Sequence, residues 1–210
     1  MNKYSIILFY GALWGFIETT VGYTSHLFHL HIANLILFPI GLACMLIATK
    51  RLDFKIYVPV AVGLLTALFK LTNFVIPVGG DFHHVINPIV SIISEGCFIS
   101  VAVWILKLEK YKITFRGIIL LYIFSMLFSL LFMSYQLYIG MRVFSYLLSA
   151  NYLAGKFGYI TYHIALFYIG TSLISKLSTI TTKEKGSRFI ETYLAIPTTL
   201  LALTASLLFM

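Results

Sequence analysis

The chain has 210 residues, of which 60% are hydrophobic and only 10% are charged, and its mean hydropathy is +0.96. Because a soluble domain cannot bury so large an apolar share, this composition excludes a soluble protein and predicts a membrane protein. The net charge of +8 follows the membrane topology described below, so it gives no support to nucleic-acid binding.

Apolar segments follow one another along the chain, and each is long enough to cross roughly 30 Å of hydrocarbon as a helix. Seven such segments occur. The second is short and contains Pro39, and the alternative for the last is to lie flat on the membrane, so the alternative count is six spans. The expected fold is an all-α, polytopic transmembrane helical bundle that forms a single domain over residues 1–210. We expect its helices at 4–24, 33–49, 56–78, 87–107, 116–138, 157–177 and 190–209.

Lysine and arginine residues are concentrated in alternate connections between these segments. The stretches 50–55, 107–116 and 175–188 hold most of them, whereas the intervening loops 25–31 and 79–84 hold none. Since positively charged loops stay in the cytoplasm, the N-terminus is expected to be cytoplasmic and the two uncharged loops external.

The first four helices contain an apparent internal repeat. A shift of 52 residues, with one insertion, superposes the segment 4–49 on the segment 56–107 and places Glu18 on Lys70. Repeats of this kind are common in membrane transport proteins. Charges at this depth are costly unless they are paired or face water, so we expect Glu18 and Lys70 to be partners. An ion pair that only fixes the helix arrangement is the alternative to a functional one.

Four titratable side chains lie at a similar depth beneath the external ends of their helices. At 1.5 Å per residue, Glu18, Lys70 and Glu95 lie roughly 10–14 Å below those ends, and His163 is slightly shallower. Together with Asn87, at the expected start of the fourth helix, they are candidate substrate-binding residues. We expect them to line a polar cavity that opens to the outside.

The two external loops contain five histidines and one aspartate. Imidazole and carboxylate groups are suitable ligands for nickel, cobalt, zinc or copper. Solvation, or capping of helix ends, is the alternative role for these side chains. The candidate metal ligands are His29, His31, Asp81, His83 and His84.

The segment "PVGGDFHHVINPIVSIISEG", residues 77–96, resembles the substrate-capture membrane subunits of energy-coupling-factor transporters, with the cobalt and nickel type nearest. The face formed by "GALWG", residues 11–15, is similar to the face by which such subunits dock on their transmembrane coupling partner. The resemblance implies His83 as the matched ligand, and a coupling membrane protein with ATPases as partners. The chain departs from the cobalt and nickel pattern at its start, "MNKYS", where those subunits have a histidine after the methionine.

We therefore expect a multi-pass transport component of a prokaryotic cell membrane that captures a small solute or a divalent metal ion from outside. It would be embedded in the lipid bilayer and would act as a binding component rather than an enzyme. The alternatives are an intramembrane metal-dependent enzyme acting on a lipid or prenyl substrate, and a structural or assembly subunit. No phosphate-binding loop occurs in the sequence, so active transport would need energy from a partner.

Overall fold

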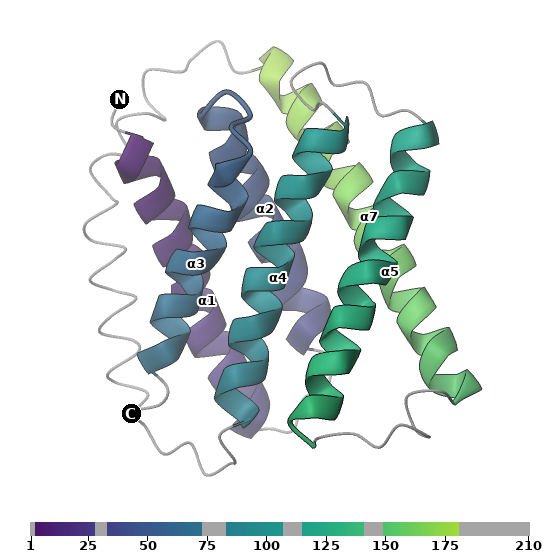
Figure 1. Ribbon diagram of the computed structural model, residues 1–210. Helices are drawn as coiled ribbons and strands as arrows, with labels where there is room; N and C mark the ends of the chain where they lie inside the picture. The colour runs from purple at the N-terminus through teal and green to yellow at the C-terminus, as the bar shows by residue number, and fades with distance from the viewer. Residues whose placement is uncertain (1–2, 28–32, 73–82, 107–114, 141–148, 181–210) are drawn as a thin grey trace.

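The computed structural model describes residues 3–27, 33–72, 83–106, 115–140 and 149–180 (Figure 1). These residues are all-helical, as expected, and the helix expected at 190–209 lies outside them. Three of the helices in these residues are long and apolar enough to cross a membrane, through Lys3–Gly22, Val85–Leu106 and Arg116–Tyr138. The described helices are α1 (Lys3–Leu27), α2 (Ala33–Arg51), α3 (Tyr57–Leu71), α4 (His83–Leu106), α5 (Phe115–Tyr138) and α7 (Ala150–Ile180).

Helix α4 begins at His83, four residues before its expected start at Asn87. The expectation that the helix starts at Asn87 is therefore wrong, and Pro88 lies inside it. A proline here removes the bond that its missing N–H would have made to the carbonyl of His84, in the first turn, and its ring crowds that carbonyl. The first turn therefore precedes the proline, and the backbone of both His83 and His84 belongs to the helix rather than to a loop.

Helix α7 also starts earlier than expected, at Ala150 rather than at residue 157. Ser149 caps its first turn, because the Ser149 Oγ accepts a hydrogen bond of 3.3 Å from the backbone N–H of Tyr152. The polar residues that follow belong to the helix and not to a connecting loop. This difference adds two turns to the end of the helix that borders the site described below.

Helices α1 and α3 pack through the small residues of α1. A Cβ atom added to Gly11 would lie 2.7 Å from the Leu65 side chain, and one added to Gly15 would lie 2.6 Å from Phe69. The Thr66 hydroxyl also donates a 3.0 Å hydrogen bond to the Gly11 carbonyl. The small-residue face of α1 is thus occupied by α3 of the same chain. This is the face that is similar in sequence to the docking face of the substrate-capture subunits.

Helices α3 and α4 approach each other even more closely, backbone against backbone. A Cβ atom on Gly96 would lie 3.0 Å from the carbonyl oxygen of Pro59, and one on Gly63 would lie 3.2 Å from that of Ile92. Only glycine permits this separation on both sides of the contact. The close contact fixes α4 against the first half of the chain, so its opposite face is left for α5 and α7.

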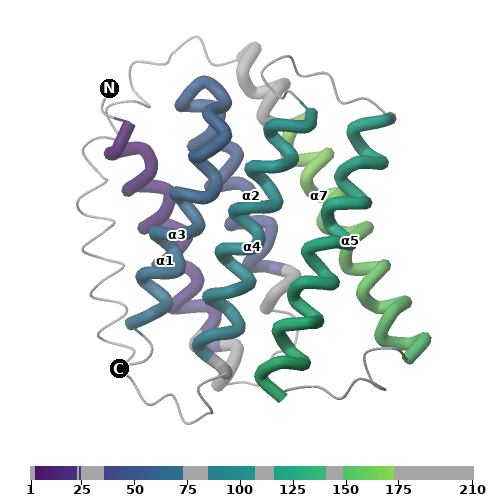
Figure 2. The backbone as a smooth tube through the Cα atoms, in the orientation of Figure 1, coloured from purple at the N-terminus to yellow at the C-terminus, as the bar shows by residue number. Residues whose placement is uncertain are grey.

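In Figure 1, α1 and α3 form one side of the bundle, α4 stands in the middle, and α5 and α7 form the other side. Figure 2 shows that α7 runs obliquely behind α5, from the end of the bundle where α4 begins to the end where α4 finishes. Helix α2 lies behind α4 and contacts α7 as well as α1 and α3. The space enclosed by α4, α5, α7 and α2 contains the candidate site.

Candidate functional site

A cavity of about 790 Å³ lies between α4, α5 and α7, with two side chains of α2 and Glu18 of α1 also in its wall. This volume falls within the roughly 300–1,000 Å³ that is usual for small-molecule sites. Its lining combines phenylalanine and tyrosine rings with hydroxyl, amide and charged groups. The cavity is therefore suited to a small organic molecule with both polar and apolar parts.

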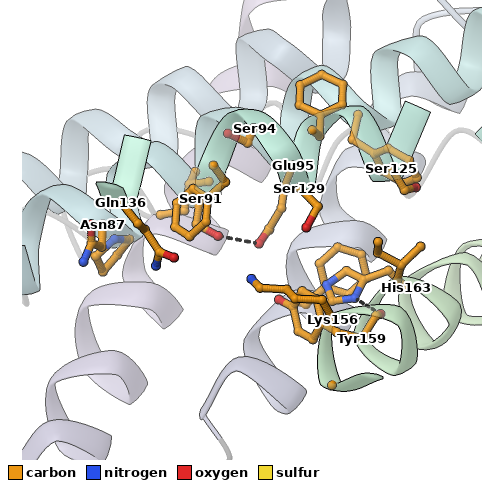
Figure 3. Close-up of a pocket in the computed structure, with 18 of the residues that line it drawn as sticks. Asn87, Ser91, Ser94, Glu95, Ser125, Ser129, Gln136, Lys156, Tyr159 and His163 are labelled. Carbon is orange, nitrogen blue, oxygen red and sulfur yellow. Dashed lines mark hydrogen bonds between the residues drawn. The ribbon is translucent and has the colours of Figure 1, made fainter. Parts of the chain in front are cut away.

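One face of α4 supplies the polar groups of the first wall. Asn87, Ser91, Ser94 and Glu95 line the cavity, and their successive spacings of four, three and one residues keep them on one side of a helix. The Ser91 hydroxyl donates a 3.2 Å hydrogen bond to Glu95 Oε1 (Figure 3). Glu95 points into the cavity, where Glu18 is near enough to act on it electrostatically. Two carboxyl groups thus share one region of the wall.

Helix α5 contributes serines and phenylalanines at positions that the sequence did not single out. Ser125, Phe128, Ser129, Phe132 and Gln136 follow one another at intervals of three, one, three and four residues and line the cavity from one face of the helix. A stripe of serine and glutamine along an apolar helix was the sequence signal that could have indicated this wall of the cavity. It is easily missed, because serine alone is unremarkable in a membrane helix.

The cavity runs along the bundle from one end toward its middle. At that end α4 begins, α5 ends and α7 begins, and Asn87, Gln136 and Asn151 line the cavity there. The Tyr152 hydroxyl donates a 3.4 Å hydrogen bond to Gln136 Oε1 and so links α7 to α5. His163 lies about three turns deeper along α7, at the inner part of the cavity.

His163 is held in a defined orientation by its own helix and by aromatic neighbours. Its Nδ1 atom lies 2.7 Å from the Tyr159 carbonyl oxygen, and its ring centroid lies 3.6 Å from that of Phe38 and 3.8 Å from that of Tyr159. A carbonyl oxygen only accepts, so Nδ1 carries the proton of the neutral ring and Nε2 is the acceptor. The site therefore contains a fixed acceptor at its inner end.

Lys156 enters the cavity wall from α7, and the sequence reasoning missed it. Its ammonium nitrogen lies 5.5 Å from the ring centroids of both Phe132 and Tyr152, and 5.9 Å from that of Tyr159. These distances are typical of cation–π contacts. In Figure 3 the side chains of Lys156 and Glu95 face each other across the cavity, from α7 and α4.

The structure brings Glu18 and Lys70 close together in the interior. Both are buried, and Lys70 Nζ donates a 3.3 Å hydrogen bond to the backbone carbonyl of Glu18. A Cβ atom added to Gly22 would lie 3.0 Å from Lys70 Nζ and 3.9 Å from Glu18 Oε2. These two charged atoms are therefore less than about 7 Å apart. The Trp14 Nε1–H donates to Glu18 Oε1 at 3.3 Å. Lys70 lies behind Glu18 and is not part of the cavity wall.

Four of the five candidate substrate-binding residues, Glu18, Asn87, Glu95 and His163, thus line one cavity. The candidate metal ligands cannot be placed in the same way. His29, His31 and Asp81 lie outside the described residues, as do the side chains of His83 and His84 at the start of α4. Among the described residues there is no group of three or more His, Cys, Asp or Glu side chains that could hold a metal ion.

Comparison of the chain with protein-family models, with curated proteins and with solved structures gives no match. Two features of the structure bear on the function. The cavity has a polar interior that opens at one end of the bundle, and the helices that enclose it have an apolar exterior.

Proposed function

We propose that the chain is an integral membrane protein that captures a small organic solute in the cavity between α4, α5 and α7. The observation that carries this proposal is the distribution of polar groups around α5. Ser125 and Ser129 face the cavity, whereas Ile123, Leu130 and Leu131 are exposed on the outside, Leu130 by 56% and Leu131 by 67%. In water this pattern would leave a large unpartnered apolar patch, while in lipid it is the expected arrangement.

The charge distribution supports an external opening for the cavity. Lys50 and Arg51 end α2 and Arg116 stands at the start of α5, at the opposite end of the bundle from Asn87 and Gln136. Since basic residues favour the cytoplasmic side, the mouth of the cavity faces outward in this proposal. A site that opens outward and ends within the bundle is suited to capturing a solute for transport.

An organic solute is favoured over a metal ion by the size and chemistry of the cavity. A volume of about 790 Å³ with a mixed aromatic and polar lining suits an organic solute better than a bare metal ion. The metal version depends on histidine side chains that lie outside the described part of the structure, and it stays a prediction. Any ATP-driven step requires ATPases and a coupling membrane protein as partners, because the sequence has no phosphate-binding loop.

The proposal is tested by blocking the cavity. Gly155 lines it and Gly158 does not, and a Cβ atom at either position would meet nothing within 4 Å. Gly155→Phe should therefore fill the cavity without disturbing the packing, and Gly158→Phe is the matched control on the same helix. The purified chain is incubated with a defined mixture of amino acids, amines, carboxylates, nucleosides and sugars, and retained solutes are measured by mass spectrometry.

The wild-type chain and Gly158→Phe should retain the same solute, and Gly155→Phe should lose at least nine-tenths of it. Retention of no solute by the wild-type chain, or equal retention by Gly155→Phe, would contradict the proposal. Circular dichroism and gel filtration of both variants establish that the helices and the folded state are intact.

A further inference from the structure

We infer that the solute is a zwitterion of the amino-acid type, with Glu95 binding its ammonium group and Lys156 binding its carboxylate group. This inference rests on the proposed function and names the class of solute. It starts from the fact that an acid on α4 and a base on α7 face each other across the same cavity (Figure 3). The two side chains come from separate walls, so a molecule between them meets both charges.

Glu95 provides the site for a cation. A carboxylate accepts about four hydrogen bonds, and the Ser91 hydroxyl occupies a position on Oε1. Ser91 thereby orients the side chain toward the cavity, and the nearby Glu18 carboxyl group adds negative potential at the same wall. An ammonium group, with its three N–H donors, matches a carboxylate in such a position, and its charge offsets the cost of placing that carboxylate in an apolar surrounding.

Lys156 provides the site for an anion. The rings of Phe132, Tyr152 and Tyr159 surround its ammonium group and hold the charge at the cavity wall. A carboxylate on the cavity side would add a charge-assisted hydrogen bond to these contacts. A solute with a single charge would place an apolar group against either Lys156 or Glu95, which is unfavourable in a space this enclosed.

The remaining cavity is too large for a head group alone, and aromatic rings form part of its wall. Phe98 of α4, Phe128 of α5 and Phe38 of α2 line it toward the inner end. An ammonium and a carboxylate on one carbon would occupy the space between the two charged side chains, while an aromatic or other apolar side chain would contact these rings. Phenylalanine combines these features in a small molecule and is therefore the first probe.

Three probes that share one aromatic body separate the two charges. Phenylalanine carries both, phenethylamine carries only the ammonium group, and 3-phenylpropionate carries only the carboxylate group. Isothermal calorimetry measures their affinities for the wild-type chain, Glu95→Gln and Lys156→Gln. Wild-type protein should bind phenylalanine at least tenfold more tightly than either of the other probes.

Lys156→Gln should weaken phenylalanine and 3-phenylpropionate at least tenfold and change phenethylamine less than twofold. Glu95→Gln should weaken phenylalanine and phenethylamine at least tenfold and change 3-phenylpropionate less than twofold. The probe that keeps its affinity shows that each variant is folded. Equal losses for all three probes, or no binding of phenylalanine by the wild-type chain at millimolar concentration, would overturn the inference.

These results are separable from those that test solute capture. If the chain retains a nucleoside or a sugar, and Gly155→Phe abolishes its retention, the cavity binds a solute but the zwitterion inference is wrong. If Gly155→Phe has no effect on any retained solute, solute capture by this cavity is itself wrong.

Discussion

Breaking the buried contact between Glu18 and Lys70 should destabilise the protein substantially. The two side chains are only 7% and 3% exposed, and their charged atoms lie less than about 7 Å apart. At an effective dielectric constant of about 20, unit charges at that distance attract each other by about 2 kcal/mol. Removal of one partner adds the penalty of a buried charge without compensation, so each single change should cost about 3–5 kcal/mol.

The assay is a double-mutant cycle with Glu18→Gln, Lys70→Met and the double variant, using the free energy of unfolding in mixed detergent micelles. The double variant should lose about 2 kcal/mol less stability than the sum of the two single losses. Each single change removes the same interaction, so the sum counts that interaction twice. Lys55→Met is the control, since Lys55 is exposed and should change stability by less than about 0.5 kcal/mol. Additive losses within about 0.5 kcal/mol would refute the claim that these charges interact.

Two further predictions concern packing and metal binding. Gly41→Ala should lower the free energy of unfolding by about 1–3 kcal/mol, because its Cβ would lie 2.4 Å from the buried ring of Trp14. Gly155→Ala, measured in the same way, should cause no loss of stability, because its Cβ would meet nothing within 4 Å. If His83 and His84 do bind nickel, cobalt, zinc or copper, calorimetry should show affinity falling below about pH 6.5, where imidazoles gain a proton. Unchanged metal affinity in His83→Ala and His84→Ala would exclude both residues as ligands.

The helical fold could be predicted from hydropathy, because apolar runs of membrane length have few alternatives. The ends of the helices could not. Asn87 and Pro88 resemble a helix start, yet the backbone of α4 forms a turn before them. The polar segment that begins with Asn151 has the composition of a loop, but the cap at Ser149 and contacts with α5 hold it in α7.

The candidate site could be predicted only through the depth of its charged residues. Depth along the helices grouped Glu18, Glu95 and His163, and these three residues line one cavity in the structure. It also included Lys70, whose side chain lies behind Glu18, because sequence position sets depth but only weakly sets direction. Lys156 was missed because its segment was assigned to a loop.

The central claim is that a water-accessible cavity lies inside a bundle whose exterior faces lipid. Ser129 and Leu130 are neighbours on α5 at nearly the same depth, but Ser129 lines the cavity and Leu130 is exposed on the outside. The decisive measurement places a cysteine at each position in turn, with Cys44 and Cys97 replaced by alanine, and adds a charged, membrane-impermeant thiol reagent outside intact cells. We expect labelling at position 129 and none at position 130. Equal or faster labelling at position 130, or no labelling at position 129, would contradict it.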